Sequence, residues 1–229
     1  HMNGFVHLHL HSEYSLLDGA CRITDIPARV KACGQEAVAL TDHGVMYGAV
    51  AFWQACKKEG IKPIIGCEVY VAHSSRFEKT VGADGYADHL VLLCESNEGY
   101  RNLCEMVSLS FTEGFYNKPR VDEELLRRYH GGLIALSACL GGKIPKQLAK
   151  GNYKAARETA LRYREIFGEG NFYIEIQDHG LAEQKTMLPM LVDLARDCSL
   201  PLAATNDCHY LRRQDANAQA VLMCIQTNT

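Results

Sequence analysis

The chain has 229 residues, of which 47% are apolar, so it is long enough for one large domain with a substantial core. Its formal net charge of −3 gives no basic footprint for binding nucleic acid. No apolar stretch approaches the roughly 20 residues of a membrane-spanning helix, and no secretory signal follows the start. The ten cysteines contain no C-x-x-C pair. We therefore expect a cytoplasmic protein without a disulfide framework.

Short runs rich in Val, Ile and Leu alternate with amphipathic segments along the chain. The runs predict strands at residues 5–10, 37–41, 63–71, 89–94, 132–138, 172–177 and 201–205. The segments between them predict helices at residues 25–34, 48–60, 97–111, 152–168 and 182–198, and Gly34, Gly60 and Gly168 stand where three of them end. This alternation favours a parallel sheet that curls into a closed or nearly closed barrel. An open doubly wound sheet is the alternative, although no G-x-G-x-x-G follows the first strand.

The first predicted strand, within FVHLHLHS (residues 5–12), carries histidines at alternate positions. In a regular strand, His7, His9 and His11 would share one face. Two imidazoles at positions i and i+2 make a good pair of metal ligands. A polar face turned to solvent is the simpler explanation, and this segment alone leaves both interpretations open.

Further residues able to bind metal lie within the predicted strands or just after their carboxyl ends. They are Asp18, Asp42 and His43, Glu68, Cys139, Glu175 to His179 in EIQDH, and Asp207 and His209. The carboxyl ends of the strands form the active site of a βα barrel. Because chance would scatter such residues over both ends, the pattern favours a site there. His89 is an exception, since it begins its apolar run instead of ending it.

The motifs HLHLHS…LLDG, TDHG, IKPIIGCEVYV, DHLVLL, SACLGG and TNDCHYLRRQDA…VLMCIQT stand in this order along the chain. As an ordered set they resemble the polymerase-and-histidinol-phosphatase (PHP) domain, and more narrowly the N-terminal PHP domain of bacterial DNA polymerase III alpha subunits. The resemblance implies a single distorted (β/α)7, TIM-like barrel. It also implies that residues 3–229 are the PHP domain of a longer subunit whose polymerase active site lies outside this chain. Residues 1–2 look like the remnant of a purification tag.

The resemblance also implies a metal centre. Its ligands would be His9, His11, Asp18, His43, Glu68, His89, Cys139, Asp207 and His209. The implied cofactors are two or three divalent cations, of zinc, manganese or iron. One cation would take His9, His11, Glu68 and Asp207, a second would take Glu68, His89 and Cys139, and a third would take Asp18, His43 and His209. Glu68 would bridge two cations, because a carboxylate offers two oxygens. Glu68, Asp207 and His43 are the expected catalytic residues.

The implied activity is attack by hydroxide on a DNA phosphodiester, in a 3′–5′ exonuclease that proofreads the 3′ end of a primer strand. From their place in loops, Lys118 and Arg120 in YNKPRV would bind phosphate or else belong to a solvated turn, and His179 would contact the substrate. We expect His7 to be structural or to support the ligands, and Asp42 to orient His43 or a water.

Two other functions remain open for this chain. One is a structural or docking module for the remaining domains of the polymerase subunit and for a separate proofreading exonuclease. The other is a small-molecule phosphatase of the histidinol-phosphatase type. No membrane partner is expected.

Overall fold

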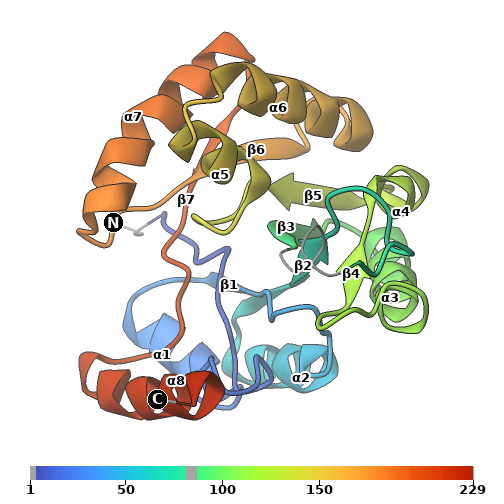
Figure 1. Ribbon diagram of the computed structural model, residues 1–229. Helices are drawn as coiled ribbons and strands as arrows, with labels where there is room; N and C mark the ends of the chain where they lie inside the picture. The colour runs from blue at the N-terminus through green and yellow to red at the C-terminus, as the bar shows by residue number, and fades with distance from the viewer. Residues whose placement is uncertain (1–3, 81–86, 229) are drawn as a thin grey trace.

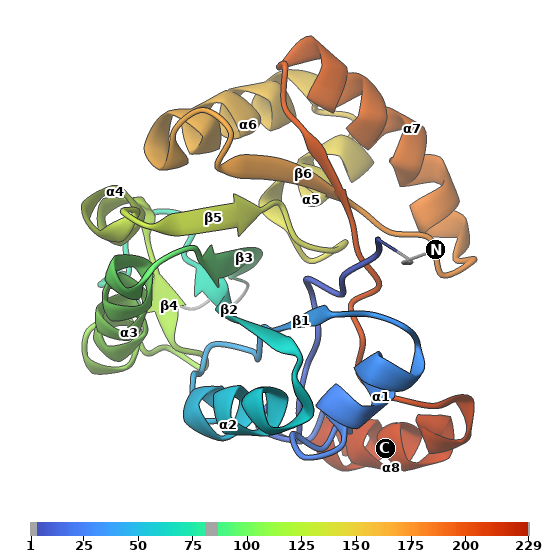
Figure 2. The ribbon, with the colours of Figure 1, turned by 180° about the vertical axis from the view of Figure 1, so that it is seen from behind.

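The computed structural model describes residues 4–80 and 87–228, so the expectation for residues 1–2 lies outside the described residues. Six strands lie side by side in one curled sheet, in the order β1 (Ala37–Leu40), β2 (Lys62–Val71), β3 (Asp88–Cys94), β5 (Leu133–Leu136), β6 (Phe172–Ile176) and β7 (Leu202–Ala204). A short strand, β4 (Arg120–Val121), pairs with the end of β2. The strands enclose the centre of the molecule and the helices lie outside them (Figures 1 and 2). The prediction of a distorted α/β barrel is confirmed.

The N-terminal segment closes the sheet between β7 and β1 without forming a regular strand. His7 pairs with Val38 of β1, and Leu10 pairs with Cys208 beyond β7, in isolated parallel bridges. The backbone bends at His9 between these bridges. The continuous strand predicted at residues 5–10 is therefore wrong, and so is the common face expected for three histidines. The His7 ring instead lies with Nδ1 3.4 Å from the Cys208 sulfur.

Strand β3 runs antiparallel to both of its neighbours, whereas the other described pairs in the sheet are parallel. His89, near its start, pairs with Tyr70, near the end of β2. Cys94, at its end, pairs with Leu133, at the start of β5. The prediction of a wholly parallel sheet is wrong at this strand, because a fully buried apolar run carries no information about its direction.

Five helices confirm the predicted amphipathic segments: α1 (Ile26–Ala32), α2 (Ala49–Glu59), α3 (Asn97–Thr112), α6 (Tyr153–Phe167) and α7 (Ala182–Asp197). The sequence did not predict α4 (Glu123–Tyr129), α5 (Lys143–Ala149), the 3₁₀ turn Arg213–Asp215 or α8 (Ala216–Thr227). Two of these helices have seven residues each, which is too short to show a helical period, and α8 buries none of its residues. Within the described ranges, no helix is long and apolar enough to cross a membrane.

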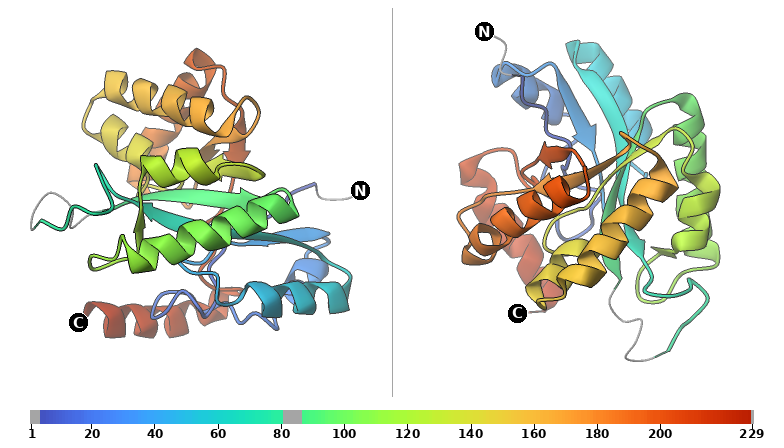
Figure 3. Two further views of the ribbon diagram at one scale, coloured as in Figure 1. Left: turned by 90° about the vertical axis from the view of Figure 1, so that its right-hand side faces the viewer. Right: turned by 90° about the horizontal axis from the view of Figure 1, so that it is seen from above.

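The apolar core lies between the sheet and the surrounding helices. The larger cluster joins Leu92 of β3 and Phe172 of β6 to Leu103 of α3, and all three side chains are fully buried. A second cluster packs Phe52 of α2 and Ile26 of α1 against β1. Burying one such side chain stabilises the fold by roughly 1.5–3 kcal/mol. The side view in Figure 3 (left) shows helices on both sides of the strands. This packing fixes the positions of the strand ends and of the polar side chains that they carry.

Candidate metal centre

Glu68 of β2 lies at the centre of the polar cluster, and each of its oxygens faces two imidazoles. Oε1 lies 3.3 Å from His9 Nε2 and 3.0 Å from His89 Nδ1. Oε2 lies 3.6 Å from His11 Nε2 and 2.6 Å from His43 Nδ1. The Glu68 side chain is completely buried. Four histidines from the N-terminal segment, the end of β1 and the start of β3 therefore converge on one carboxylate.

Asp207, which follows β7, faces the two histidines of the N-terminal segment. Its Oδ1 lies 3.3 Å from His9 Nε2 and 3.1 Å from His11 Nε2. Asp207 has a φ of 46°, a left-handed conformation that Asp tolerates better than most residues. The metal-binding atoms of these three residues all lie within 4.8 Å of one another.

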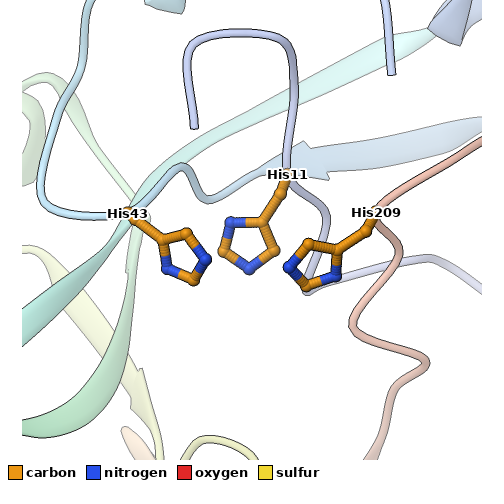
Figure 4. A group of neighbouring side chains, drawn as sticks. All are labelled: His11, His43 and His209. Atoms are coloured by element: carbon orange, nitrogen blue, oxygen red, sulfur yellow. The ribbon is translucent and has the colours of Figure 1, made fainter. Parts of the chain in front are cut away.

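Asp18, His43 and His209 form the neighbouring part of the cluster. Asp18 Oδ2 lies 2.9 Å from His43 Nε2 and 3.6 Å from His209 Nε2. The His11 ring stacks between the rings of His43 and His209 (Figure 4), with centroids 3.9 Å from His43 and 4.5 Å from His209. Helix α8 supports this part, because Gln219 Nε2 donates to the Asp18 carbonyl at 3.3 Å.

His89 reaches the cluster because β3 is antiparallel. The start of β3 lies beside the end of β2, so a residue that begins its strand meets residues that follow theirs. Cys139 lies next to it, with Sγ 4.0 Å from His89 Nδ1. The structure thus brings all nine predicted ligand residues to one end of the barrel, and their role as ligands stays a prediction.

Buried atoms in the cluster lack ordinary partners. Among the predicted ligand residues, all of which the structure describes, five buried atoms have no hydrogen bond: His9 Nε2, His11 Nε2, His43 Nδ1, Glu68 Oε2 and Asp207 Oδ1. The close contact between His43 Nδ1 and Glu68 Oε2 therefore lacks hydrogen-bond geometry. Leaving buried polar atoms unpaired costs about 1–3 kcal/mol each. A cation among them would satisfy these atoms, and a set of imidazoles, carboxylates and one thiol suits zinc, iron or manganese. The residues present therefore fit divalent metal ions.

The charges of the cluster shift its pKa values in opposite directions. Burial lowers the pKa of His43, but its contacts with Asp18 and Glu68 outweigh burial and raise it to about 9. Burial and the charge of His43 lower the pKa of His11 to about 3. Burial raises the pKa of Glu68, but the charges of His89 and His9 hold it well below its usual value. In the absence of cations, protons on some of the imidazoles balance the carboxylates.

Glu175 of β6 holds His9 in place, a role that the sequence did not assign to it. Its Oε1 accepts a hydrogen bond from His9 Nδ1 at 2.7 Å, and the side chain is 1% exposed. Gln177 Nε2 and the Thr205 hydroxyl also donate to this oxygen. The bond fixes the His9 tautomer whose Nε2 faces Asp207. The only signal in the sequence was the place of Glu175 at the end of a strand.

Asp42 supports the cluster through two serines. It accepts hydrogen bonds from the Ser12 amide at 2.6 Å and from the Ser15 hydroxyl at 2.7 Å. The Ser15 hydroxyl lies 3.1 Å from His11 Nδ1 and also accepts from the His43 amide at 3.1 Å. Asp42 therefore acts on both histidines indirectly, through Ser15.

A cleft of about 480 Å³ opens over Asp18, His43 and His89, and Lys118 is part of its wall. Lys118 Nζ lies 4.3 Å from the centre of the Tyr70 ring. The structure therefore places a cationic side chain beside the cluster, where the sequence predicted a contact with phosphate.

The other two predicted substrate contacts lie differently. Arg120 is 1% exposed, and its guanidinium donates to the carbonyls of Gly114 at 3.0 Å and Glu78 at 2.8 Å. The predicted phosphate contact of Arg120 is therefore not supported, because this arginine binds the chain's own backbone. His179 is exposed, and its amide donates to Gln184 Oε1 at 2.7 Å. The lining of the cleft, as far as described residues form it, does not include His179.

The fold and the cluster define a class of protein, the barrels that gather histidines and carboxylates at one end of their strands. The family model of the PHP domain matches residues 7–179, and the chain belongs to this family. A crystal structure of an inferred metal-dependent phosphoesterase from Bifidobacterium adolescentis has the same fold, with a TM-score of 0.55. The alignment covers 90% of this chain and 88% of that one, at 13% identity.

Two curated relatives are DNA polymerase III alpha subunits. The chain is 50% identical over 226 residues to the subunit of Treponema pallidum (strain Nichols), covering 97% of this chain and 19% of that protein. It is 46% identical over 229 residues to the subunit of Thermus aquaticus, covering 98% of this chain and 19% of that protein. The chain therefore spans about a fifth of the length of these relatives.

Proposed function

We propose that this chain is a metal-dependent phosphodiesterase domain of a cytoplasmic replicative polymerase alpha subunit, and that it removes nucleotides from the 3′ end of DNA. One observation carries the proposal: buried, unpaired nitrogen and oxygen atoms of five residues converge below an open cleft. The relatives, which are DNA polymerase III alpha subunits, supply the polymerase context. They favour DNA over a small phosphate ester as the substrate.

Different residues of the cluster would bind metal, orient the imidazoles and contact the substrate. One cation would be held by His9, His11, Glu68 and Asp207. A second would be held by Glu68, His89 and Cys139, and a third by Asp18, His43 and His209. Bound divalent cations would activate a water and neutralise charge on the phosphoryl oxygens. Glu175 and Asp42 keep the imidazoles oriented. Lys118 binds a phosphate oxygen that does not react. No serine or cysteine is needed as a nucleophile.

The test is a nuclease assay on the metal-loaded chain with single-stranded DNA labelled at its 5′ end. We expect stepwise shortening from the 3′ end that a chelator abolishes and added Mn²⁺ or Zn²⁺ restores. An Asp207→Asn variant, purified in the same way, controls for contaminating nucleases. Equal shortening by this variant, or none by the wild type with any of the metals, would overturn the proposal.

A groove on the outside of the barrel favours docking as a second candidate function. It has a volume of about 580 Å³ and is lined by Trp53 of α2, Ile65 of β2 and Tyr100 of α3. Trp53 is 48% exposed there. A separate exonuclease or another domain of the subunit would bury this ring. Trp53→Ala should then weaken that association and leave the metal content unchanged.

A further inference from the structure

Aromatic side chains stand around the mouth of the cleft above the metal centre. Tyr14, Tyr47 and Phe111 line it and are 36%, 61% and 36% exposed. They come from three segments that are far apart in the sequence: the loop before Asp18, the turn before α2 and the end of α3. Single exposed aromatic rings are ordinary on protein surfaces. Three such rings around one cleft, whose floor is a candidate metal site, call for a functional explanation.

Two of these rings are backed by other groups, which holds them in place. A Cβ atom added to Gly48 would lie 2.9 Å from Tyr14 Cδ2, so the Tyr14 ring packs directly on the glycine backbone. Phe111 stacks on Phe115, with centroids 6.1 Å apart and planes at 23°. A ring that is already ordered loses little conformational entropy when a ligand covers its exposed face.

The cleft changes from apolar to polar with depth. Tyr70, 7% exposed, lies below the rim, with its ring centre 6.1 Å from that of His43 and 4.3 Å from Lys118 Nζ. The side chains of Asp18, His43 and His89 at the floor are only 17–21% exposed. A ligand that fits this order has a phosphate at its deep end and flat apolar rings at its outer end. The terminal nucleotides of a single strand have this form, whereas paired bases in a duplex have no free faces to offer.

Resting on the proposed function of the metal centre, we propose that Tyr14, Tyr47 and Phe111 form a base-stacking rim that selects single-stranded 3′ ends. The rim holds the unpaired terminal bases by stacking, without reading their sequence, while their phosphates reach the floor. Recognition by stacking also explains how a chain with a net charge of −3 binds the 3′ end of a nucleic acid. The rim would then favour frayed or mispaired ends over paired ones.

The test measures binding without cleavage. Fluorescence anisotropy follows a 5′-labelled oligothymidylate with phosphorothioate linkages at its 3′ end, in the presence of Mn²⁺. A second oligonucleotide carries abasic residues at its last two positions. We expect the wild type to bind the base-bearing end about five- to a hundredfold more tightly. Tyr47→Ala and Phe111→Ala should lose most of this preference, and Tyr47→Phe, which keeps the ring, should retain it.

Trp53→Ala is the matched control, because Trp53 is an aromatic residue whose exposure lies between those of Phe111 and Tyr47 and which lines the outer groove and not the cleft. The Trp53→Ala variant should prefer the base-bearing oligonucleotide as strongly as the wild type does. The proposed rim would be contradicted if the wild type bound both oligonucleotides equally well. It would also be contradicted if Tyr47→Ala and Phe111→Ala both kept the wild-type preference. A chain that shows the preference but releases no nucleotide would contradict the proposed activity and leave the rim intact.

Discussion

The two oxygens of Glu68 face four histidines, and no other carboxylate among the described residues makes that many contacts with imidazoles. A fully buried carboxylate in this position is stable only with compensating positive charge. Protons on the histidines supply that charge in the metal-free protein, and cations would supply it in the metal-loaded one. The proposed bridging role of Glu68 follows from this geometry.

Replacing Glu68 with Gln keeps the size of the side chain and removes its charge. We expect Glu68→Gln to lose most of its bound metal and more than about 100-fold of any nuclease rate, because two cation sites weaken together. The fold should survive, as judged by circular dichroism. Full metal content and a normal rate would show that Glu68 is only a structural carboxylate.

Asp42 provides a weaker variant for comparison, since its carboxylate contacts His11 and His43 through Ser15 and not directly. We expect Asp42→Asn to weaken metal binding by about 10–100-fold, less than Glu68→Gln. Competition with a chromogenic chelator measures both affinities. A loss as large as that of Glu68→Gln would place Asp42 among the ligands.

Glu175→Gln tests the hydrogen bond that orients His9. The amide can present an NH₂ group to His9 Nδ1, which favours the tautomer whose Nε2 carries a proton and cannot bind a cation. We expect metal affinity to fall by about 10–100-fold in the same competition assay. Asp178→Asn, in the exposed loop that follows, is the control and should bind metal normally. An unchanged affinity in Glu175→Gln would remove this residue from the account.

At the level of elements, the apolar runs predicted where most strands lie. They did not predict the direction of β3. His89 looked misplaced in the sequence for that reason alone. A buried run is compatible with either direction, and the pairing that fixes it comes from Tyr70 and Leu133 on strands distant in sequence. Resemblance to a family assigned His89 to the cluster, and the antiparallel β3 brings it beside Glu68, while its role as a ligand stays a prediction.

The N-terminal segment shows the opposite failure. The alternation in FVHLHLHS predicted a regular strand, but the backbone bends at His9 and makes only separate bridges. This bend lets His7 contact Cys208 while His9 and His11 face the carboxylates. The hydrogen bond between Glu175 and His9 could not be predicted either, because the two residues lie 166 positions apart. Tertiary contacts, which no local pattern encodes, decide both features.

The loop that carries Asp18 includes a strained residue. Leu17 has a φ of 60° and is 43% exposed, so it adopts a left-handed conformation with little burial in return. Glycine adopts this conformation without a Cβ clash, whereas alanine does not. We expect Leu17→Gly to be more stable than Leu17→Ala by about 1 kcal/mol in urea unfolding. Equal stability of the two variants would show that the loop relaxes the strain in another way.

For the molecule as a whole, metal binding and pH should be linked. Burial lowers the pKa of His9, His43 and His209, but neighbouring carboxylates outweigh burial and raise all three, His43 to about 9. Their protonation stabilises the metal-free fold fully below the unfolded value of about 6.5, and this stabilisation is lost as the pH rises towards 9. Cations that replace these protons are not lost over that range.

The metal-dependent rise in melting temperature should therefore grow between pH 6.5 and 8.5. Thermal melts with saturating metal and with a chelator, at several pH values in this range, measure the difference. The increase should come mainly from a falling midpoint of the metal-free protein. A difference that stays constant or shrinks as the pH rises would contradict the proposed exchange of protons for cations.

The most direct test of the account is the number of cations that one chain binds, counted by native mass spectrometry after loading with Mn²⁺ or Zn²⁺. We predict two or three cations in the wild type and at most one in Glu68→Gln. A wild type that binds none, or a variant that binds as many as the wild type, would contradict a shared metal centre at the ends of these strands.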